Sequence, residues 1–219
     1  GKNSGDGFLL GSYAKEFGLQ VTVVMSNSVS ELKGVSKKAF LEMKESKVKV
    51  ITTKSVGKLK VSNNAVIVDA LIGTGLKGIL RKNIKDSILA INQLGIKSPV
   101  VSLDIPSGMN PDTGSVNDVC VFADITATFV ANKRGCFTSV GKKVSGEIIY
   151  SELDIPSKIF SNVASTSSLI NHEDKIDKVV YREQDSHKGH FGHVIVIGGD
   201  IGLGGAGILA SKAAVYSGA

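Results

Sequence analysis

Short runs of β-branched apolar residues alternate with longer amphipathic segments along the first two thirds of this chain. Runs typical of strands lie at residues 20–25, 47–52, 65–69, 99–104, 119–130 and 146–150. Segments with a helical spacing of apolar residues lie among them, at residues 5–18, 29–46 and 84–94. Strands that alternate with helices in this way indicate βαβ units and a parallel sheet, so the fold class that we expect is α/β.

The last third of the chain follows a different pattern. Residues 157–168 are polar and rich in serine, as in a linker. They are followed by an apolar run at residues 193–197, a Gly-Gly-Asp turn and a helical segment at residues 204–216. One such β-loop-α unit cannot bury a core by itself, and the chain opens in a glycine-rich loop of the kind that follows a strand. We therefore expect an internal fragment of a longer, two-domain protein.

Two of the expected strands end on a carboxylate. Asp69 closes the apolar run 65–68 and precedes a glycine-rich loop, and Asp104 closes the run 99–103. Pro106 prevents further ladder pairing after Asp104. Because ligands bind outside the carboxyl ends of strands in open parallel sheets, Asp104 is a candidate for chemistry. An aspartate that only caps the turn after the strand is the open alternative.

Three polar or glycine-rich loops are expected at this edge of the sheet. They comprise residues 1–7, 73–79 and 104–108. The first leads into an apolar helical segment, and a glycine-rich turn at a helix N-terminus exposes unpaired N–H groups that suit phosphate. One loop of this kind is weak evidence, whereas three at neighbouring strand ends predict one shared crevice.

Composition narrows the classes of protein to which the chain can belong. Of its 219 residues 42% are hydrophobic, no run of about 18 apolar residues occurs, and the first residues do not resemble a signal peptide. Cys120 and Cys136 lack a metal-ligand spacing, and two thiols in a chain of this length are typical of the reducing cytoplasm. The net charge of +6 comes from scattered lysines with few aromatic residues among them, so we expect neither a membrane nor a nucleic-acid partner.

Two patterns near the end of the chain are weaker candidates for chemistry. His187, His190 and His193 have a regular spacing, but the glycines between them disfavour the helix that would align them on one metal ion. We interpret them as a loop that leads into a strand. Residues 202–207 match the dinucleotide fingerprint G-x-G-x-x-G, although the acidic residue expected about 20 positions later lies beyond Ala219.

Several motifs, in order, resemble the NAD(P)H-hydrate epimerase domain, the YjeF N-terminal family. They are Asn-Ser-Gly-Asp-Gly at residues 3–7, Val-Asp-Ala-Leu-Ile-Gly-Thr-Gly-Leu at 68–76, Leu-Asp-Ile-Pro-Ser-Gly at 103–108, Asp-Thr-Gly at 112–114, Ala-Asp-Ile-Thr-Ala-Thr-Phe at 123–129 and Lys-Arg-Gly at 133–135. Residues 186–199 resemble the opening of the ADP/ATP-dependent NAD(P)H-hydrate dehydratase domain, a longer match than the fingerprint at residues 202–207. This order is that of the bacterial bifunctional NAD(P)H-hydrate repair enzymes.

The resemblance implies a domain organisation. Residues 1–155 are expected to form an epimerase domain without its N-terminus, built on a three-layer, Rossmann-like, mostly parallel sheet. Residues 156–180 are the expected linker. Residues 181–219 are the expected start of a truncated dehydratase domain, the first β-loop-α unit of a ribokinase-like fold.

The resemblance also implies which residues form the site. The substrate-binding residues that it implies are Asn3, Ser4, Gly5, Asp6, Gly73, Thr74, Gly75, Leu76, Lys77, Gly78, Ile79, Asp104 and, in the second part, Ala206. Lys2 and Ser4 depart from the family's usual Gly-Asn-Asn-Gly-Gly-Asp-Gly loop, so the resemblance assigns no role to Lys2. A potassium ion is expected on Asn3, Asp69 and Ser107, whose oxygen atoms suit a hard cation.

The implied activity is interconversion of the R and S epimers of hydrated NADH or NADPH. The parent protein would also dehydrate the S epimer with ADP or ATP, an activity not expected of the residues present here. Epimerisation at the hydroxyl-bearing nicotinamide carbon needs a proton donor and acceptor, and Asp104 is the expected catalytic residue. We also expect a cytoplasmic homo-oligomer.

Two other functions stay open. Epimerase-like domains also serve as non-catalytic, RNA-associated scaffolds in mRNA-decapping proteins, although a pure scaffold need not keep Asn3, Asp69, Asp104 and Ser107. The last third alone suggests a sugar- or nucleotide-phosphate kinase. It lacks the distal part in which such a fold places its catalytic base.

Overall fold

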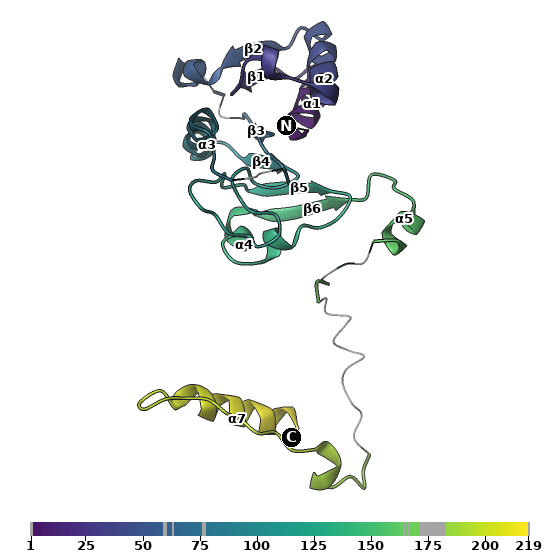
Figure 1. Ribbon diagram of the computed structural model, residues 1–219, viewed down its shortest axis with the longest axis vertical. Coiled ribbons are helices and arrows are strands. Elements are labelled where there is room, and N and C mark those ends of the chain that lie inside the picture. Colours follow the sequence, from purple (N-terminus) through teal and green to yellow (C-terminus); the bar gives the residue numbers. More distant parts are fainter. Residues whose placement is uncertain are drawn as a thin grey trace. The chain divides into compact units, whose positions relative to one another are not determined.

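The computed structural model describes residues 2–58, 61–62, 64–75, 78–163, 165, 167–170 and 183–218. The chain divides into two units, Gly1–Ser165 and Thr166–Ala219, which are described one at a time (Figure 1). The division falls inside the expected linker at residues 156–180, part of which lies outside the described residues.

The strands of the first unit are all parallel. Strands β1 (Thr22–Met25) and β2 (Lys49–Thr52) form one pair. A four-stranded sheet has the order β3-β4-β5-β6, with bounds Ile67–Asp69, Val100–Leu103, Ile125–Phe129 and Glu147–Ser151. Its register sets Asp69 opposite Ser102 and Leu103 opposite Ala127. The expected α/β class with a parallel sheet is therefore confirmed, although the strands form two sheets among the described residues.

Three long helices cover these strands. Helices α1 (Asn3–Glu16) and α2 (Gly34–Glu45) lie on one side of the strands in Figure 1, and α3 (Lys82–Gly95) lies on the other. The core under α1 and α2 consists of Phe8, Met25, Ala39, Phe40, Met43 and Val48. Ile88 of α3 is fully buried in a separate cluster with Val100 of β4. The apolar spacing that predicted these helices thus corresponds to the faces that they bury.

A third cluster lies behind the end of β4. It contains Ile105, Met109, Cys120, Cys136 and Val144, the last from the short helix α4 (Gly141–Val144). The Pro-Ser-Gly turn after β4 needs its glycine, because Gly108 has a φ of +99° and a Cβ there would collide with the carbonyl oxygen of Val119.

In the first unit, most element ends differ from the sequence-based expectation by one or two residues, but three expectations were wrong. Residues 3–7 begin α1 and are not a loop. The helix expected at residues 29–46 is divided, because Ser28 and Glu31 form a capping box on a separate 3-10 turn, η1 (Val29–Glu31). Residues 119–124 are not part of a strand, since N–H groups there are used elsewhere: that of Val121 donates to the Ser107 carbonyl.

Short elements complete the first unit. They are the 3-10 segments η2 (Thr53–Lys58) and η3 (Arg134–Phe137) and the helix α5 (Ser157–Ser161). The segment η2 follows β2, and η3 follows the loop after β5.

The second unit contains a 3-10 turn, η4 (Lys188–Phe191), and the helix α7 (Gly205–Ser217). The helix was expected at residues 204–216, but the strand expected at residues 193–197 is absent there. Ile195 and Ile197 are 83% and 94% exposed, and a strand needs a neighbour to pair with, which the described part of this unit does not supply. This unit therefore does not establish a ribokinase-like fold. Among the described residues of both units, no helix has the length and apolar character of a membrane span.

Candidate active site

Asp69 is a fully buried carboxylate at the end of β3. Its oxygens accept hydrogen bonds from the Ser102 hydroxyl at 2.9 Å, the Ser107 N–H at 2.8 Å and the Ser107 hydroxyl at 2.6 Å. The Leu71 N–H adds a fourth at 3.2 Å. Burial raises the pKa of Asp69, and the hydrogen bonds from Ser107 oppose that rise. This carboxylate therefore links the loops after β3 and β4.

Asn3 and Ser107 complete a buried set of oxygen atoms at the same edge. Asn3 lies in the first turn of α1, and its Nδ2 donates to the carbonyl of Leu103, the last residue of β4, at 3.1 Å. Its Oδ1 is buried without a hydrogen-bond partner in the described structure. Ser107 Oγ accepts the Ile72 N–H at 2.9 Å besides donating to Asp69. A buried amide oxygen with no donor, at the sheet edge where the Asp69 carboxylate is also buried, fits a hard cation.

Asp104 lies just beyond β4 in a different environment. Its φ is +69°, a left-handed conformation that few residues other than glycine adopt, and its N–H donates to the Ala127 carbonyl at 2.7 Å. Its Oδ1 forms an ion pair with Lys133 Nζ at 2.6 Å, and its Oδ2 accepts the Thr74 N–H at 3.1 Å. A Cβ at Gly73 would lie 2.5 Å from Oδ2, so this close approach requires glycine.

Lys133 is the site residue that sequence reasoning missed. It follows β5 and its Nζ donates to the Phe129 carbonyl at 2.7 Å, besides pairing with Asp104. Its side chain is only 16% exposed and that of Asp104 only 18%. The sequence did contain a hint, because Lys133 is the first residue of the Lys-Arg-Gly motif at 133–135. Neither the spacing of that motif nor the composition of the chain indicated what Lys133 does.

Asp104 and Lys133 line a pocket of about 490 Å³. We call it the Asp104 pocket; its residues are Asp6, Thr74, Asp104, Phe129, Val130, Lys133 and Leu153. Asp6 enters it from α1, and its pKa is raised, first by burial and then by the negative charge of Asp104. Two carboxyl groups and one ammonium group therefore meet in one cavity.

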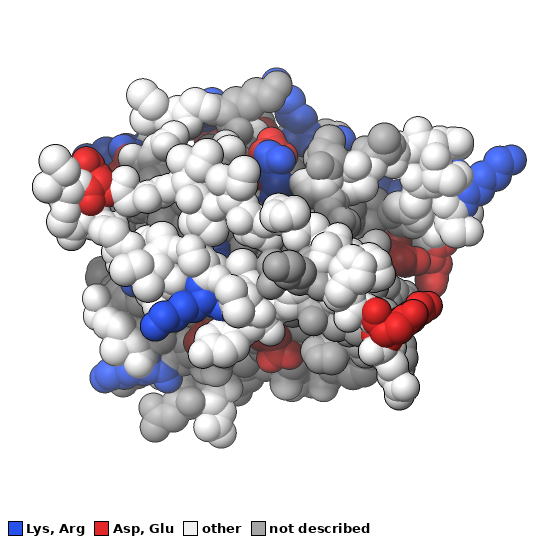
Figure 2. Space-filling view, turned by 90° about the horizontal axis from the view of Figure 1, so that it is seen from below, with Lys and Arg blue, Asp and Glu red and all other residues white. Residues whose placement is uncertain are grey.

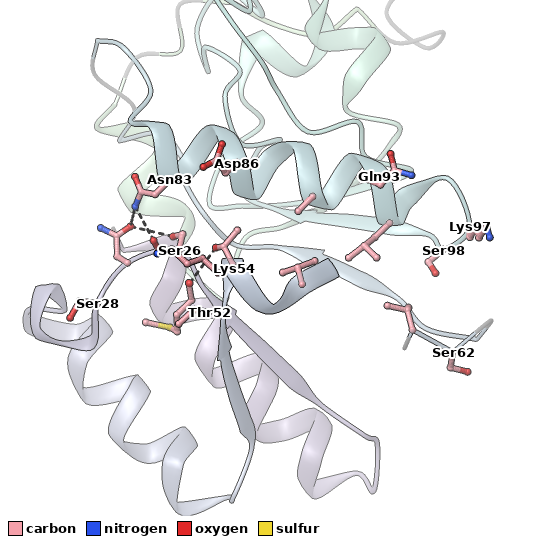
Figure 3. A pocket seen from close by; sticks show the side chains of 17 residues that line it. Ser26, Ser28, Thr52, Lys54, Ser62, Asn83, Asp86, Gln93, Lys97 and Ser98 are labelled. Atoms are coloured by element: carbon pink, nitrogen blue, oxygen red, sulfur yellow. Dashed lines mark hydrogen bonds between the residues drawn. The ribbon is translucent and has the colours of Figure 1, made fainter. Parts of the chain in front are cut away.

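A larger pocket of about 1110 Å³ lies elsewhere in the first unit (Figure 3). We call it the Asn83 pocket, after Asn83 of α3, which lines it. The Asn83 side chain donates to the Ser26 carbonyl at 2.8 Å and to Asn27 Oδ1 at 2.9 Å. This pocket contains none of the site residues expected from the sequence, so its volume does not make it the candidate site.

The structure brings the start of α1, residues 72–74 and residues 103–107 together at one edge. Asn3 contacts Leu103, Thr74 contacts Asp104, and Ile72 contacts Ser107. Other expected residues are not among those that line the Asp104 pocket. Gly5 is buried against Ser36, and Ile79 is 89% exposed.

The remaining expected residues fall into three groups. Ser4 lies in α1, whereas Gly75 and Gly78 lie in the loop after β3 and do not line the Asp104 pocket. Leu76 and Lys77 lie outside the described residues. Ala206 belongs to the second unit, in the first turn of α7.

Two of the histidines near the end of the chain contact one another. Within the described ranges, no three His, Cys, Asp or Glu side chains gather closely enough to hold a metal ion. His187 Nδ1 accepts the Gly189 N–H, and its ring lies 3.8 Å from that of His190. On the face shown in Figure 2, Lys and Arg side chains are dispersed and do not form one patch.

Residues 1–135 match the family described as YjeF-related protein N-terminus. The chain belongs to this family. The motifs at residues 3–7, 68–76 and 103–108 therefore identified the family correctly. They supply, respectively, the start of α1, the end of β3 with its loop, and the end of β4.

Several family relatives carry the name bifunctional NAD(P)H-hydrate repair enzyme. One from Coxiella burnetii is 38% identical over 219 residues, which are 100% of this chain and 44% of the relative. Those from Leishmania infantum and Escherichia coli K12 are 34% and 31% identical over all of this chain and 40% and 41% of their own length. The chain thus spans less than half of each.

A solved structure supports the fold. The crystal structure of yeast ynu0 superposes with a TM-score of 0.61 at 19% identity, over 77% of this chain and 71% of that protein. This likeness agrees with the Rossmann-like arrangement of parallel strands.

Proposed function

We propose that this chain forms the part of a repair enzyme that binds hydrated NADH or NADPH and interconverts its R and S epimers. The observation that carries the proposal is the Asp104–Lys133 ion pair, which lines a pocket at the end of β4. Family membership and the names of the relatives agree with it. The scaffold alternative is less favoured, because it gives no reason for a charged pocket beside a buried set of oxygen ligands.

Binding of the dinucleotide would use backbone N–H groups at the same edge. Helix α1 starts at Asn3 without a side-chain cap on its first N–H groups, and such a helix end suits phosphate. The glycines at 73, 75 and 78 permit close approach of a phosphate to the backbone of the loop after β3. Ser4, Gly5, Leu76, Lys77 and Ile79 remain proposed contacts on the strength of the family motif.

Asn3, Asp69 and Ser107 are the proposed holders of a potassium ion. The unpartnered Asn3 Oδ1 and the buried Asp69 carboxylate support this assignment. When bound, the cation would supply positive charge that offsets the buried carboxylate. Rubidium or thallium soaked into crystals of the full-length protein should give an anomalous peak between these three residues; a peak elsewhere with substrate bound would contradict the assignment.

Asp104 is the proposed catalytic residue. The reaction inverts the hydroxyl-bearing nicotinamide carbon and moves a proton on and off its hydroxyl group, so a carboxyl group must reach that position. Asp104 lines the pocket, and Lys133 and Thr74 fix its orientation. Ala206, in the second unit, is the proposed substrate contact of a dehydratase part that uses ADP or ATP. We also propose a cytoplasmic homo-oligomer.

The decisive experiment follows purified epimers of hydrated NADH and NADPH on a chromatographic column. The full-length protein should bring either epimer to the equilibrium mixture much faster than buffer alone. No acceleration with either compound, from protein with a cooperative unfolding transition, would refute the proposed activity and favour the scaffold.

A further inference from the structure

We infer that Asp6 is a second catalytic carboxyl group, which gives a proton to the departing hydroxyl of the substrate and takes it back. Asp104 would then act beside it as the fixed carboxylate. This inference rests on the proposed epimerase function and assigns the two carboxyl groups of the Asp104 pocket to different tasks.

The contacts of the two groups differ. Both oxygens of Asp104 are engaged, one with Lys133 and the other with the Thr74 N–H. Asp6 lines the same pocket from α1, and its carboxyl group makes no hydrogen bond or ion pair with the described residues. Asp6 is therefore free to exchange a proton with a bound molecule, whereas Asp104 is held in place.

The charges around Asp6 favour this division. Asp6 is an exposed residue, but partial burial of its carboxyl group raises its pKa, and the charge of Asp104 raises it further. Lys133 also lines the pocket and is paired with Asp104. Two neighbouring carboxyl groups with different environments are a common way to obtain one acid and one carboxylate in a single site.

The chemistry balances with these groups alone. Protonated Asp6 gives its proton to the hydroxyl, the C–O bond breaks with its electron pair on oxygen, and water forms. The lone pair of the ring nitrogen makes the carbon an iminium ion, whose positive charge the Asp104 carboxylate stabilises. Water then adds to the opposite face and returns a proton to Asp6. No atom is oxidised or reduced overall.

Asp6→Asn in the full-length protein tests the inference. We expect kcat/KM for epimerisation to fall at least about a hundredfold. In the wild type, kcat/KM should decline as pH rises through the pKa of Asp6, and the variant should lack this decline. Asp86→Asn is the matched control, since Asp86 is an exposed aspartate on α3 that lines the Asn83 pocket. It should keep wild-type activity.

A second measurement does not depend on turnover. With ¹³C-labelled aspartate, the Asp6 carboxyl resonance of the full-length protein should titrate above the usual value of 3.8, and Asp104→Asn should lower that pKa. An active wild type with an equally active Asp6→Asn variant would overturn the inference alone. An inactive wild type would overturn the proposed function. If the pKa of Asp6 is the same in the wild type and in Asp104→Asn, the two carboxyl groups are not coupled, and the division of tasks between them is refuted.

Discussion

Asp69 and Asp104 end neighbouring strands after similar apolar runs, yet the structure gives them opposite environments. Asp69 is fully buried and accepts four hydrogen bonds, from its own loop, from Ser102 of β4 and from Ser107 in the loop after β4. Asp104 lines a pocket and pairs with Lys133, a residue from beyond a third strand. One carboxylate organises the edge of the sheet, and the other is available to a ligand. The difference arises from neighbours that are distant in sequence.

The largest expected effect is the loss of stability on replacing Asp69 with alanine. The change leaves two buried hydroxyl groups and two N–H groups without their acceptor, and each unsatisfied group costs about 1–3 kcal/mol. We expect the free energy of unfolding to fall by about 3 kcal/mol or more, measured by urea denaturation. Asp104→Asn is the comparison, with an expected loss of less than about 1 kcal/mol. Equal losses would remove the distinction between the two carboxylates.

The next effect concerns the rate of epimerisation. Asp104→Asn keeps the shape of the side chain and removes its charge, so kcat/KM should fall by about a hundredfold or more. The epimers are separated by chromatography, and thermal unfolding checks that the variant is folded. If the variant has nearly normal activity, Asp104 is not catalytic and only caps the turn after β4.

Removal of the Lys133 charge should have a smaller effect on the same reaction. Lys133→Met keeps the length of the side chain and breaks the ion pair that orients Asp104; a loss of about 1 kcal/mol in transition-state stabilisation corresponds to roughly a fivefold loss in kcat/KM. Lys142→Met, at an exposed position in α4, is the control and should be fully active. If both variants behave alike, Lys133 does not position Asp104.

The smallest expected effect is on the pH dependence of stability. The pKa of Asp6 is raised in the folded state, so its contribution favours folding below the unfolded pKa and is lost as pH rises through the folded pKa. Asp6→Asn should therefore flatten the decline in unfolding free energy that begins as pH rises above 3.8, the usual pKa of the group, by less than about 1 kcal/mol. Urea denaturation at several pH values measures this, and the difference should shrink in an Asp104→Asn background, where the repelling charge is gone.

The sequence predicted the elements that bury a periodic apolar face. Helices α1 and α3 and strands β3 and β4 appear within two residues of their expected bounds, because apolar spacing and burial are directly linked. Asp69 and Asp104 were singled out because they end such strands, and the family resemblance added Asn3 and Ser107. The family motif supplied the roles, which the spacing alone did not.

What the sequence could not predict depends on contacts between distant segments. Lys133 reaches Asp104 only because β5 pairs with β4, a register that local patterns do not specify. Residues 119–124 have the composition of a strand, but the N–H of Phe122 donates its hydrogen bond to the Asn92 side chain and not to a neighbouring strand. The apolar run 193–197 has the composition of a strand, but within the described residues of its unit no neighbour pairs with it.

The alkylation rate of the buried Cys120 thiol can measure how often this region opens. Its thiol packs behind the turn that carries Ser107, and burial followed by the charge of Asp69 raises its pKa to about 11. At pH 8 only about one molecule in a thousand would then carry the reactive thiolate, and its access to reagent is blocked. Alkylation should therefore report transient local unfolding. A bound dinucleotide that stabilises the closed edge should slow alkylation by the factor 1 + [L]/Kd, which gives its affinity without any turnover.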